Sequence, residues 1–393
     1  MSSTLNDATD TFLSHPCSAP TPALLDAIRD SAAAGDQMAN LVPSHDLMLD
    51  EGLFHILVPR ELGGAAGTPT DWFDAGLAIA AADPSAGWIM LQGAVQSAWI
   101  AVSADPSFAS AFFARRQTIA TSSAGQATAE RNGDEYVVHN ARWAYVSGSE
   151  GASHLGGMVR TTRPDGAPES RMVLVPAGDA TIERSWDTHG LRGTGSHHVD
   201  LGDTLTVPAT QTFTWPTLTI TRPGPLATAA RHTLWLISVS AAAVNLGAAR
   251  QALDAAVASA QTKLHRFDTV PLIRQSPFVR AIAALEGQVE LAEAGLRRLL
   301  DELWDQASAG ERPTLVQRAR LRLAAAHAVE TGSQVVREAI SLVGADALHR
   351  SHPLERLARD TEMLRNHVVV SPSTREQLGT VLLGTYEGPP AFV

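Results

Sequence analysis

The stretch from residue 342 to residue 383 reads LVGADALHRSHPLERLARDTEMLRNHVVVSPSTREQLGTVLL, and its pattern decides how the end of the chain folds. Pro353 fits the first turn of a helix, where a missing N–H costs nothing. Apolar residues then recur at helical spacing until a break, after which a second helix is predicted with Ser371 or Ser373 as its cap. His367 stands just before this break, where freed backbone groups often line a ligand site. On periodicity alone, His367 is also typical of a buried structural histidine.

Length and composition describe a large globular chain. Of its 393 residues, 45% are hydrophobic and 18% are charged, which excludes a disordered protein. The net charge of −11 and the lack of a long basic run argue against binding to nucleic acid or to an anionic membrane surface. A single cysteine, Cys17, excludes a disulfide framework and fits a cytoplasmic location. We expect no signal peptide and no membrane span.

The pattern of apolar and turn residues divides the chain into three parts. Residues 1–116 are predicted to form a helical domain, with Thr70 and Asp83 as caps of two of its helices. Residues 117–222 show short period-2 runs and turn dipeptides, which predict a small β-barrel or sandwich. Residues 223–393 contain long apolar helical patterns, including one from 226 to 263, and predict a four-helix bundle. The expected fold class is therefore α+β.

Several common sites are absent from the sequence. There is no GxxxxGK[ST] string and no GxSxG string, so neither a P-loop nor a nucleophile elbow is expected. The run from Gly190 to Gly195 lacks the spacing of a dinucleotide fingerprint, so no nicotinamide-binding domain is predicted. The pairs His197–His198 and His349–His352 have no cysteine or carboxylate at metal-ligand spacing, and we predict no metal site.

Three strings carry functional potential. The first is WAYVSG, with Trp143 and Ser147, where an indole and a hydroxyl could lie beside a flat cofactor. The second is WDTHGLRGTGS at 186–196, where glycines allow a ligand to approach the backbone and hydroxyls could donate to it. The third is PLERLARD at 353–360. Taken singly, the first two are also typical of an aromatic strand end and a glycine-rich hairpin.

Together with VPRELGG, DPSAGW and LRGTGSHHV, these strings resemble the acyl-CoA dehydrogenase superfamily from about residue 20 to residue 384. The resemblance implies an N-terminal helical domain, a middle β-domain and a C-terminal four-helix bundle. It also implies a flavin held between the middle domain and the bundle, in a homotetramer where a neighbouring subunit contributes to the flavin site.

One position separates the reactions of this superfamily. Its dehydrogenases place a catalytic glutamate shortly after the RD of the last-helix motif, where this chain has His367 and Val368. A valine cannot act as a base. The string Tyr386-Glu387-Gly388 lies about twenty residues too late, and we predict that it is not the catalytic one. The predicted helix from 226 to 263, where some members carry the base, has Asp254 as its only acid.

A histidine at this position resembles the two-component flavin-dependent monooxygenases of the hydroxyphenylacetate and dibenzothiophene types. Those enzymes use FMNH2 or FADH2 from a separate NAD(P)H:flavin reductase, together with O2, through a C4a-hydroperoxide. Carried over, Ser147 would hydrogen-bond flavin N5 and His367 would lie near C4a, where an imidazole could donate a proton. The second histidine of some members is Val370 here. Ser147 and His367 are the predicted catalytic pair.

The resemblance also suggests contacts to cofactor and substrate. Further predicted flavin contacts are Trp143, Arg192, Thr194, Ser196, Arg266 and Phe267, and because the RxxFG-like string reads HRFD here, both FMN and FAD remain open. The apolar helix around 84–103 could line a pocket for an aromatic or polycyclic substrate, with Trp88, Met90, Leu91, Gln92 and Trp99 as its predicted contacts. The alternatives are an FAD dehydrogenase or oxidase with another base, an N-hydroxylase of an amino sugar, and a non-catalytic flavin carrier.

Overall fold

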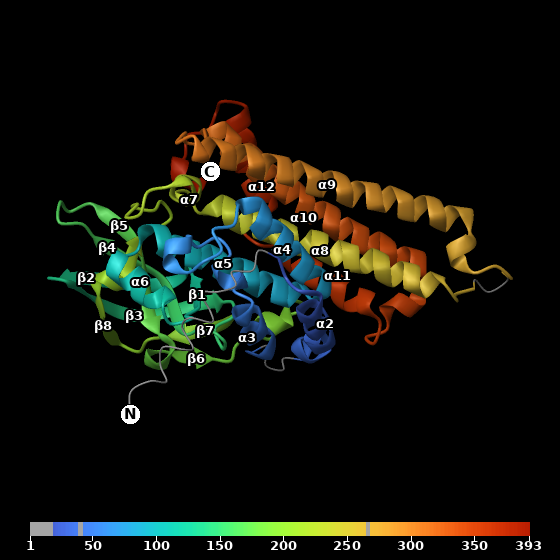
Figure 1. Cartoon of the computed structure of the whole chain (residues 1–393), viewed down its shortest axis with the longest axis horizontal. Helices are drawn as coiled ribbons and strands as arrows, with labels where there is room; N and C mark the ends of the chain where they lie inside the picture. Colours follow the sequence, from blue (N-terminus) through green and yellow to red (C-terminus); the bar gives the residue numbers. More distant parts are fainter. Residues whose placement is uncertain (1–18, 38–41, 265–267) are drawn as a thin grey trace.

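The computed structural model describes residues 19–37, 42–264 and 268–393. Cys17, Arg266 and Phe267 lie outside these residues. The order of elements is helices, then strands, then helices, and the predicted α+β class is confirmed (Figure 1). The division at residues 116 and 222 stays a prediction.

The N-terminal part is helical, and prolines and side-chain caps define where its helices begin. Thr21, Thr68, Asp83 and Asp105 each accept a backbone N–H at a helix start, and a proline follows each cap. The α5 helix is buried along its whole length of 20 residues, as its continuous apolar sequence indicates. The helices are α2 (Pro22–Asp36), α3 (Val42–Asp50), α4 (Pro69–Ala82), α5 (Pro84–Ser103) and α6 (Pro106–Phe113).

The middle part is one nine-stranded sheet with the order β6-β7-β3-β2-β4-β5-β9, to which β1 adds beside β4 and β8 beside β3. The turn at Asn132–Gly133 joins β2 to β3, and the turn at 164–166 joins β4 to β5. The strands are β1 (Ile119–Ser122), β2 (Ala124–Asn132), β3 (Glu135–Val146), β4 (His154–Thr162), β5 (Pro168–Pro176), β6 (Thr181–Glu183), β7 (His197–Asp200), β8 (Thr204–Pro208) and β9 (Thr212–Thr214).

The C-terminal part is a bundle of long helices. Pro353 begins α11, and Ser371 caps α12, as the sequence predicted. The pattern from 226 to 263 gives two helices instead of one, because the carbonyl of Arg231 accepts the N–H of Leu218 instead of continuing the helix. The helices are α7 (Pro225–Ala230), α8 (Leu234–Ala260), α9 (Ser276–Ser308), α10 (Leu315–Val343), α11 (Pro353–Arg365) and α12 (Pro372–Leu382).

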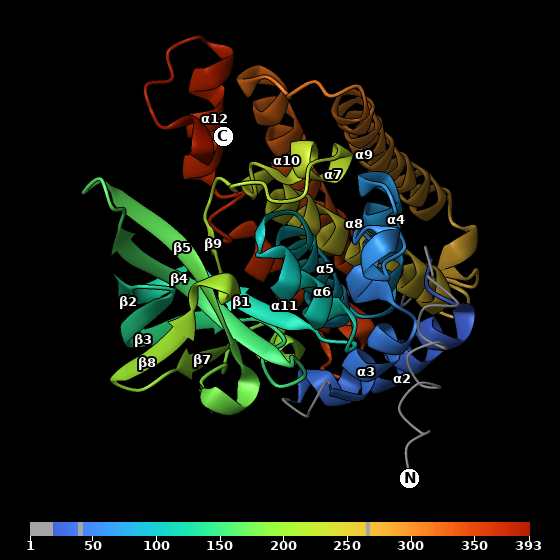
Figure 2. The same ribbon diagram turned by 60° about the vertical axis from the view of Figure 1, so that its left-hand side comes forward.

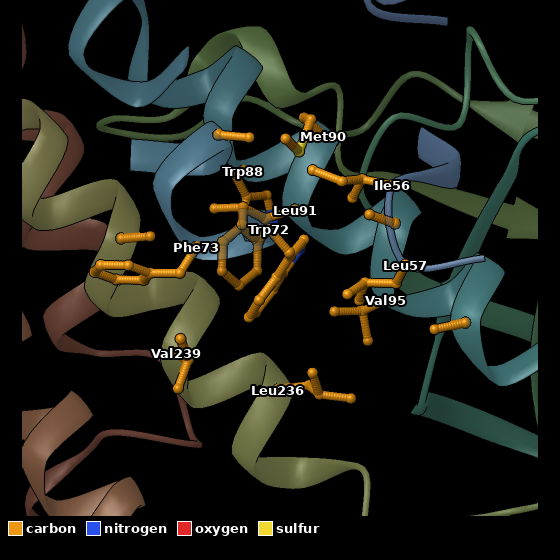
Figure 3. Close-up of a cluster of buried hydrophobic side chains, with 14 of the residues drawn as sticks. Ile56, Leu57, Trp72, Phe73, Trp88, Met90, Leu91, Val95, Leu236 and Val239 are labelled. Atoms are coloured by element: carbon orange, nitrogen blue, oxygen red, sulfur yellow. The ribbon is translucent and has the colours of Figure 1, made fainter. Parts of the chain in front are cut away.

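The largest core lies where α4 and α5 of the N-terminal part meet α8 of the bundle. Trp72, Phe73, Trp88 and Leu91 point into this region from α4 and α5, and Val239 points into it from α8 (Figure 3). Turning the molecule shows α5 and α6 between the sheet and the bundle (Figure 2). The N-terminal helices therefore connect the other two parts.

One sequence expectation about these helices is wrong. The cap of α4 is Thr68 instead of Thr70, since Thr68 and Asp71 form a capping box two residues earlier. By length and composition, α8 could cross a membrane. However, 83% of its most apolar window is buried inside the protein, so its apolar character serves packing.

Gly247 of α8 tests how closely α4 and α8 must approach. A Cβ at Gly247 would lie 2.6 Å from the carbonyl oxygen of Leu77 and 2.7 Å from the Cβ of Ala80. We expect Gly247→Ala to lower the free energy of unfolding by about 1–3 kcal/mol, measured by urea denaturation. Gly287→Ala is the control, because Gly287 lies in α9 with no atom within 4 Å of its Cβ position. It should raise stability by up to about 1 kcal/mol; equal effects of the two changes would contradict the close approach.

Candidate functional site

Ser147 and His367, the predicted catalytic pair, both contact one indole. The Nε1 of Trp88 in α5 donates a hydrogen bond of 3.0 Å to the Oγ of Ser147, which directly follows β3. The rings of Trp88 and His367 meet edge to face with their centroids 5.3 Å apart. Three segments that are distant in sequence, namely α5, the end of β3 and the turn after α11, therefore meet at Trp88.

A chain of hydroxyl groups extends from Ser147 into the glycine-rich loop at 186–196. The Oγ of Ser147 lies 2.7 Å from the Oγ of Ser196, which lies 2.7 Å from the Oγ1 of Thr194. Thr194 in turn donates to the carbonyl oxygen of Leu191 at 2.8 Å. Ser196 and Thr194 are buried, whereas Ser147 is half-buried. The structure thus brings three of the predicted residues into one connected network.

His367 is a neutral imidazole. It is half-buried in the turn after α11, and burial lowers its pKa from 6.5 to about 4. The backbone N–H of Val369 donates to Nδ1 at 3.4 Å, which leaves the proton on Nε2. At pH 7 it offers a neutral N–H donor instead of an imidazolium.

Asp360 fixes the glycine-rich loop to α11. Its Oδ1 accepts the backbone N–H of Leu191 at 2.6 Å, and its side chain is buried. Burial, and then the neighbouring Asp83, raises the pKa of Asp360 from 3.8 to about 7. Beside this bond, a Cβ at Gly190 would lie 2.2 Å from the carbonyl oxygen of Arg359, so only glycine allows the loop to lie this close.

The same helix holds two further segments. Arg359 makes a two-pronged contact to the carboxylate of Asp36 at the end of α2, with distances of 3.0 and 2.9 Å. Arg356 lies 3.8 Å from the carboxylate of Asp83, which caps α5. Thus α11 positions α2, the start of α5 and the loop that carries Thr194 and Ser196. Sequence reasoning used the RLARD string only as a landmark and missed this role.

Comparison with known proteins gives the fold a name. Residues 239–372 match the family model described as "Acyl-CoA dehydrogenase, C-terminal domain". The chain is 26% identical over 375 residues to an indole-3-acetate monooxygenase of Acinetobacter baumannii, covering 93% of this chain and 94% of the relative. It is also 26% identical over 377 residues to the oxygenase subunit HsaA, a flavin-dependent monooxygenase of Rhodococcus jostii, with coverages of 93% and 96%.

A solved structure agrees. XiaF from a Streptomyces species, in complex with FADH2 and glycerol, superimposes with a TM-score of 0.82 at 21% identity and covers 96% of each chain. The chain has the acyl-CoA dehydrogenase fold. The resemblance to the flavin-dependent monooxygenase branch of this superfamily, inferred from the sequence, is confirmed.

The groups at this site suit the ring system of the flavin that this branch of the acyl-CoA dehydrogenase fold uses. Ser147 supplies a half-buried hydroxyl, and Tyr145 supplies an exposed aromatic ring beside it. His367 supplies a neutral N–H, and Trp88 supplies an aromatic wall. An isoalloxazine is flat and has hydrogen-bonding edges, so these groups fit it. Among the residues described, no three His, Cys, Asp or Glu side chains are arranged to hold a metal ion.

The predicted flavin contact by Trp143 is wrong. Trp143 is fully buried in the core of the sheet, where its Nε1 donates to the carbonyl oxygen of Met158 at 3.1 Å. The aromatic residue that is exposed beside Ser147 is Tyr145, at 61%. Tyr145 has a positive φ of 62°, and the pairing of β3 with β7 shifts register between Trp143 and Val146. This bulge breaks the period-2 alternation that would place Trp143, Tyr145 and Ser147 on one face of a regular strand.

The predicted substrate contacts in α5 divide into two groups. Met90 and Leu91 have no exposed surface, and Leu91 packs where a Cβ on Gly76 would stand, so both predictions are wrong. Gln92 is 7% exposed and Trp99 is 2% exposed. Within the part of the chain that the structure describes, the Nε2 of Gln92 and the Nε1 of Trp99 have no hydrogen-bond partner. Both donors are buried, and the predicted substrate contacts of Gln92 and Trp99 stay predictions.

Arg192 is occupied by contacts within the chain. Its Nε donates to the carbonyl oxygen of Asp36 at 2.9 Å, and its Nη1 donates to the carbonyl oxygen of Thr188 at 2.8 Å. These bonds tie the glycine-rich loop to α2. The predicted contact of Arg192 with flavin stays a prediction.

The raised pKa of Asp360 predicts a pH-dependent stability. Between pH 4 and pH 7 the folded state keeps a proton that the unfolded state releases, so the free energy of unfolding falls as pH rises. Asp360→Asn keeps an oxygen for the N–H of Leu191 but cannot ionise. We expect the stability of the wild type relative to Asp360→Asn to fall by up to about 4 kcal/mol across this range.

Urea denaturation at several pH values measures the difference between the two proteins. Asp254→Asn serves as the control, because Asp254 is exposed on α8. A difference between the wild type and Asp360→Asn that does not change with pH would show that Asp360 ionises normally.

Proposed function

We propose that this protein is the oxygenase component of a two-component flavin-dependent monooxygenase. The observation that carries the proposal is the neutral His367 beside Trp88 and Ser147, at the place where the dehydrogenases carry a glutamate. The two acids that could replace that glutamate, Asp254 and Glu387, are both exposed. A buried general base for removing an α-proton is therefore not provided by either candidate.

The residues of the site have separate roles in this proposal. Reduced flavin, when bound, supplies the electrons that activate O2. Ser147 accepts a hydrogen bond from the flavin at N5, and His367 donates its Nε2 proton as a hydrogen bond toward the oxygen that is transferred. Trp88 holds Ser147 in place and shields the site from water. Because these groups are uncharged, they do not attract the water that a buried ion requires.

Further contacts to the flavin come from the glycine-rich loop and from a second copy of the chain. Thr194 and Ser196 support Ser147, and we assign Arg192 to the flavin's polar edge. Arg266 and Phe267 lie outside the described residues, and their predicted contact with the flavin stays a prediction. Either FMN or FAD fits this assignment.

The substrate is an aromatic or polycyclic small molecule. Trp88 and Trp99 provide aromatic surface on α5, and both bury most of that surface in an apolar core. The free N–H groups of Gln92 and Trp99 can recognise an oxygen or another acceptor on such a molecule. This assignment is supported by the relative from Acinetobacter baumannii, whose name gives indole-3-acetate, an aromatic molecule.

The reduced flavin comes from a separate NAD(P)H:flavin reductase, since the sequence has no nicotinamide-binding fingerprint. The assembly is a homotetramer in the cytoplasm. Supporting this assembly, α9 lies on the outside of the bundle and exposes Val279 at 51% and Leu291 at 76% (Figure 1).

Flavin oxidation tests this function. Anaerobic protein is mixed with reduced FMN or FAD and then with oxygenated buffer in a stopped-flow spectrometer. We expect a delay before the absorbance of oxidised flavin appears. His367→Ala and Ser147→Ala should each shorten this delay at least tenfold, because each removes about one hydrogen bond between uncharged groups in a buried site. His349→Ala, which removes an exposed histidine, should leave the delay unchanged. Immediate oxidation of the reduced flavin by the wild-type protein, with no delay, would contradict the proposal.

A further inference from the structure

The hydroxyl chain behind Ser147 has a direction. Each of Ser147, Ser196 and Thr194 carries one hydroxyl proton, and each can accept further hydrogen bonds. The oxygen of Leu191 at the far end is a carbonyl, which can only accept. Because Thr194 lies 2.8 Å from that carbonyl, its proton belongs to this bond.

The proton of every other hydroxyl follows from this one. Since the proton of Thr194 points to Leu191, the 2.7 Å contact between Thr194 and Ser196 needs the proton of Ser196. The 2.7 Å contact between Ser196 and Ser147 then needs the proton of Ser147. All protons in the chain therefore point away from Trp88 and toward the glycine-rich loop.

Ser147 is left with a single unused site. Its proton is donated to Ser196, and one of its two lone pairs accepts the N–H of Trp88 at 3.0 Å. What remains is one lone pair on a half-buried oxygen. Ser147 thus presents an acceptor, and not a donor, to a molecule bound beside it.

This distinction separates the two redox states of a flavin. The N5 atom of a reduced isoalloxazine carries a hydrogen and donates, whereas N5 of the oxidised ring has only a lone pair and accepts. We infer that Thr194 and Ser196, by orienting the proton of Ser147, make the site selective for reduced over oxidised flavin. The inference rests on the proposed function, in which Ser147 faces N5, and it assigns the selectivity to residues that do not themselves touch N5.

The opposite orientation of the three hydroxyl protons is disfavoured by the contact between Thr194 and Leu191. If Ser147 turned its proton toward oxidised flavin, three hydroxyl protons would have to serve four contacts, so one pair of oxygens would have no proton between them. In the fully reversed arrangement this pair is the Oγ1 of Thr194 and the carbonyl oxygen of Leu191, which lie 2.8 Å apart. Leu191 cannot easily move away, since its N–H is held by Asp360 at 2.6 Å and its carbonyl also accepts the Nε1 of Trp186 at 2.9 Å.

The test compares affinities for two redox states of the same flavin. FMN and FAD, each oxidised or reduced with dithionite under anaerobic conditions, are titrated into the full-length protein, and dissociation constants are measured by fluorescence or absorbance. Wild type should bind the reduced form more tightly. Thr194→Val and Ser196→Ala should each lower the ratio of the oxidised to the reduced dissociation constant about fivefold to tenfold, mainly by tightening oxidised flavin. A tenfold change equals a fall of about 30 mV in the potential of the bound flavin.

Two variants serve as controls. Thr194→Ser keeps the terminal hydroxyl and should keep the wild-type ratio. Ser149→Ala removes a buried hydroxyl that donates to the carbonyl oxygen of Gly195 at 3.2 Å. This hydroxyl is not part of the hydrogen-bonded series Ser147–Ser196–Thr194, so the variant should also keep the ratio. Circular dichroism of each variant verifies its fold.

The outcomes separate this inference from the proposed function. If wild type binds reduced flavin more tightly but Thr194→Val and Ser196→Ala keep the wild-type ratio, the orienting role is wrong and the proposed function stands. If wild type binds neither redox state, both are wrong. A ratio that falls in Thr194→Val and Ser196→Ala and is retained in Thr194→Ser supports the inference.

Discussion

The hydrogen bond between the backbone N–H of Leu191 and the carboxyl of Asp360 is the constraint on which the site depends. It joins residues 169 positions apart and connects the β-domain loop to the bundle. The loop carries Thr194 and Ser196, which hold Ser147, and the helix that carries Asp360 ends just before His367. One buried carboxyl therefore sets the distance between the two halves of the candidate catalytic pair.

The contacts around this bond show why it is specific. Gly190 approaches the backbone of α11 so closely that any side chain would collide with the carbonyl of Arg359. Arg359 binds Asp36 in α2 with both of its terminal nitrogens, and Arg356 faces Asp83 at the start of α5. Since Trp88 lies only one turn after this start, α11 also fixes the indole between Ser147 and His367. Stability and site geometry thus share the same set of buried polar contacts.

Much of the architecture could be predicted from the sequence, because it depends on local signals. Period-2 and helical patterns predicted the order of the three parts, residue type identified Asp83 as a cap, and it narrowed the cap of α12 to Ser371 or Ser373. The site was only partly predictable. Ser147 and His367 were placed by motif order, but Trp143 was misassigned because the bulge at Tyr145 changes which side chains face out. Asp360 was missed, since a bond across 169 residues leaves no periodic signal in the sequence.

The distribution of charge around the site explains how neutral groups can act there. The ionised side chains Arg359 and Asp36 neutralise each other behind the loop, whereas the groups around Trp88 are hydroxyls and a neutral imidazole. Burial disfavours charge on both His367 and Asp360, by lowering one pKa and raising the other. Where uncharged groups face a ligand, the orientation of a single hydroxyl proton can distinguish one ligand from another. A site of this kind can discriminate between molecules that differ by hydrogen atoms and hardly differ in shape.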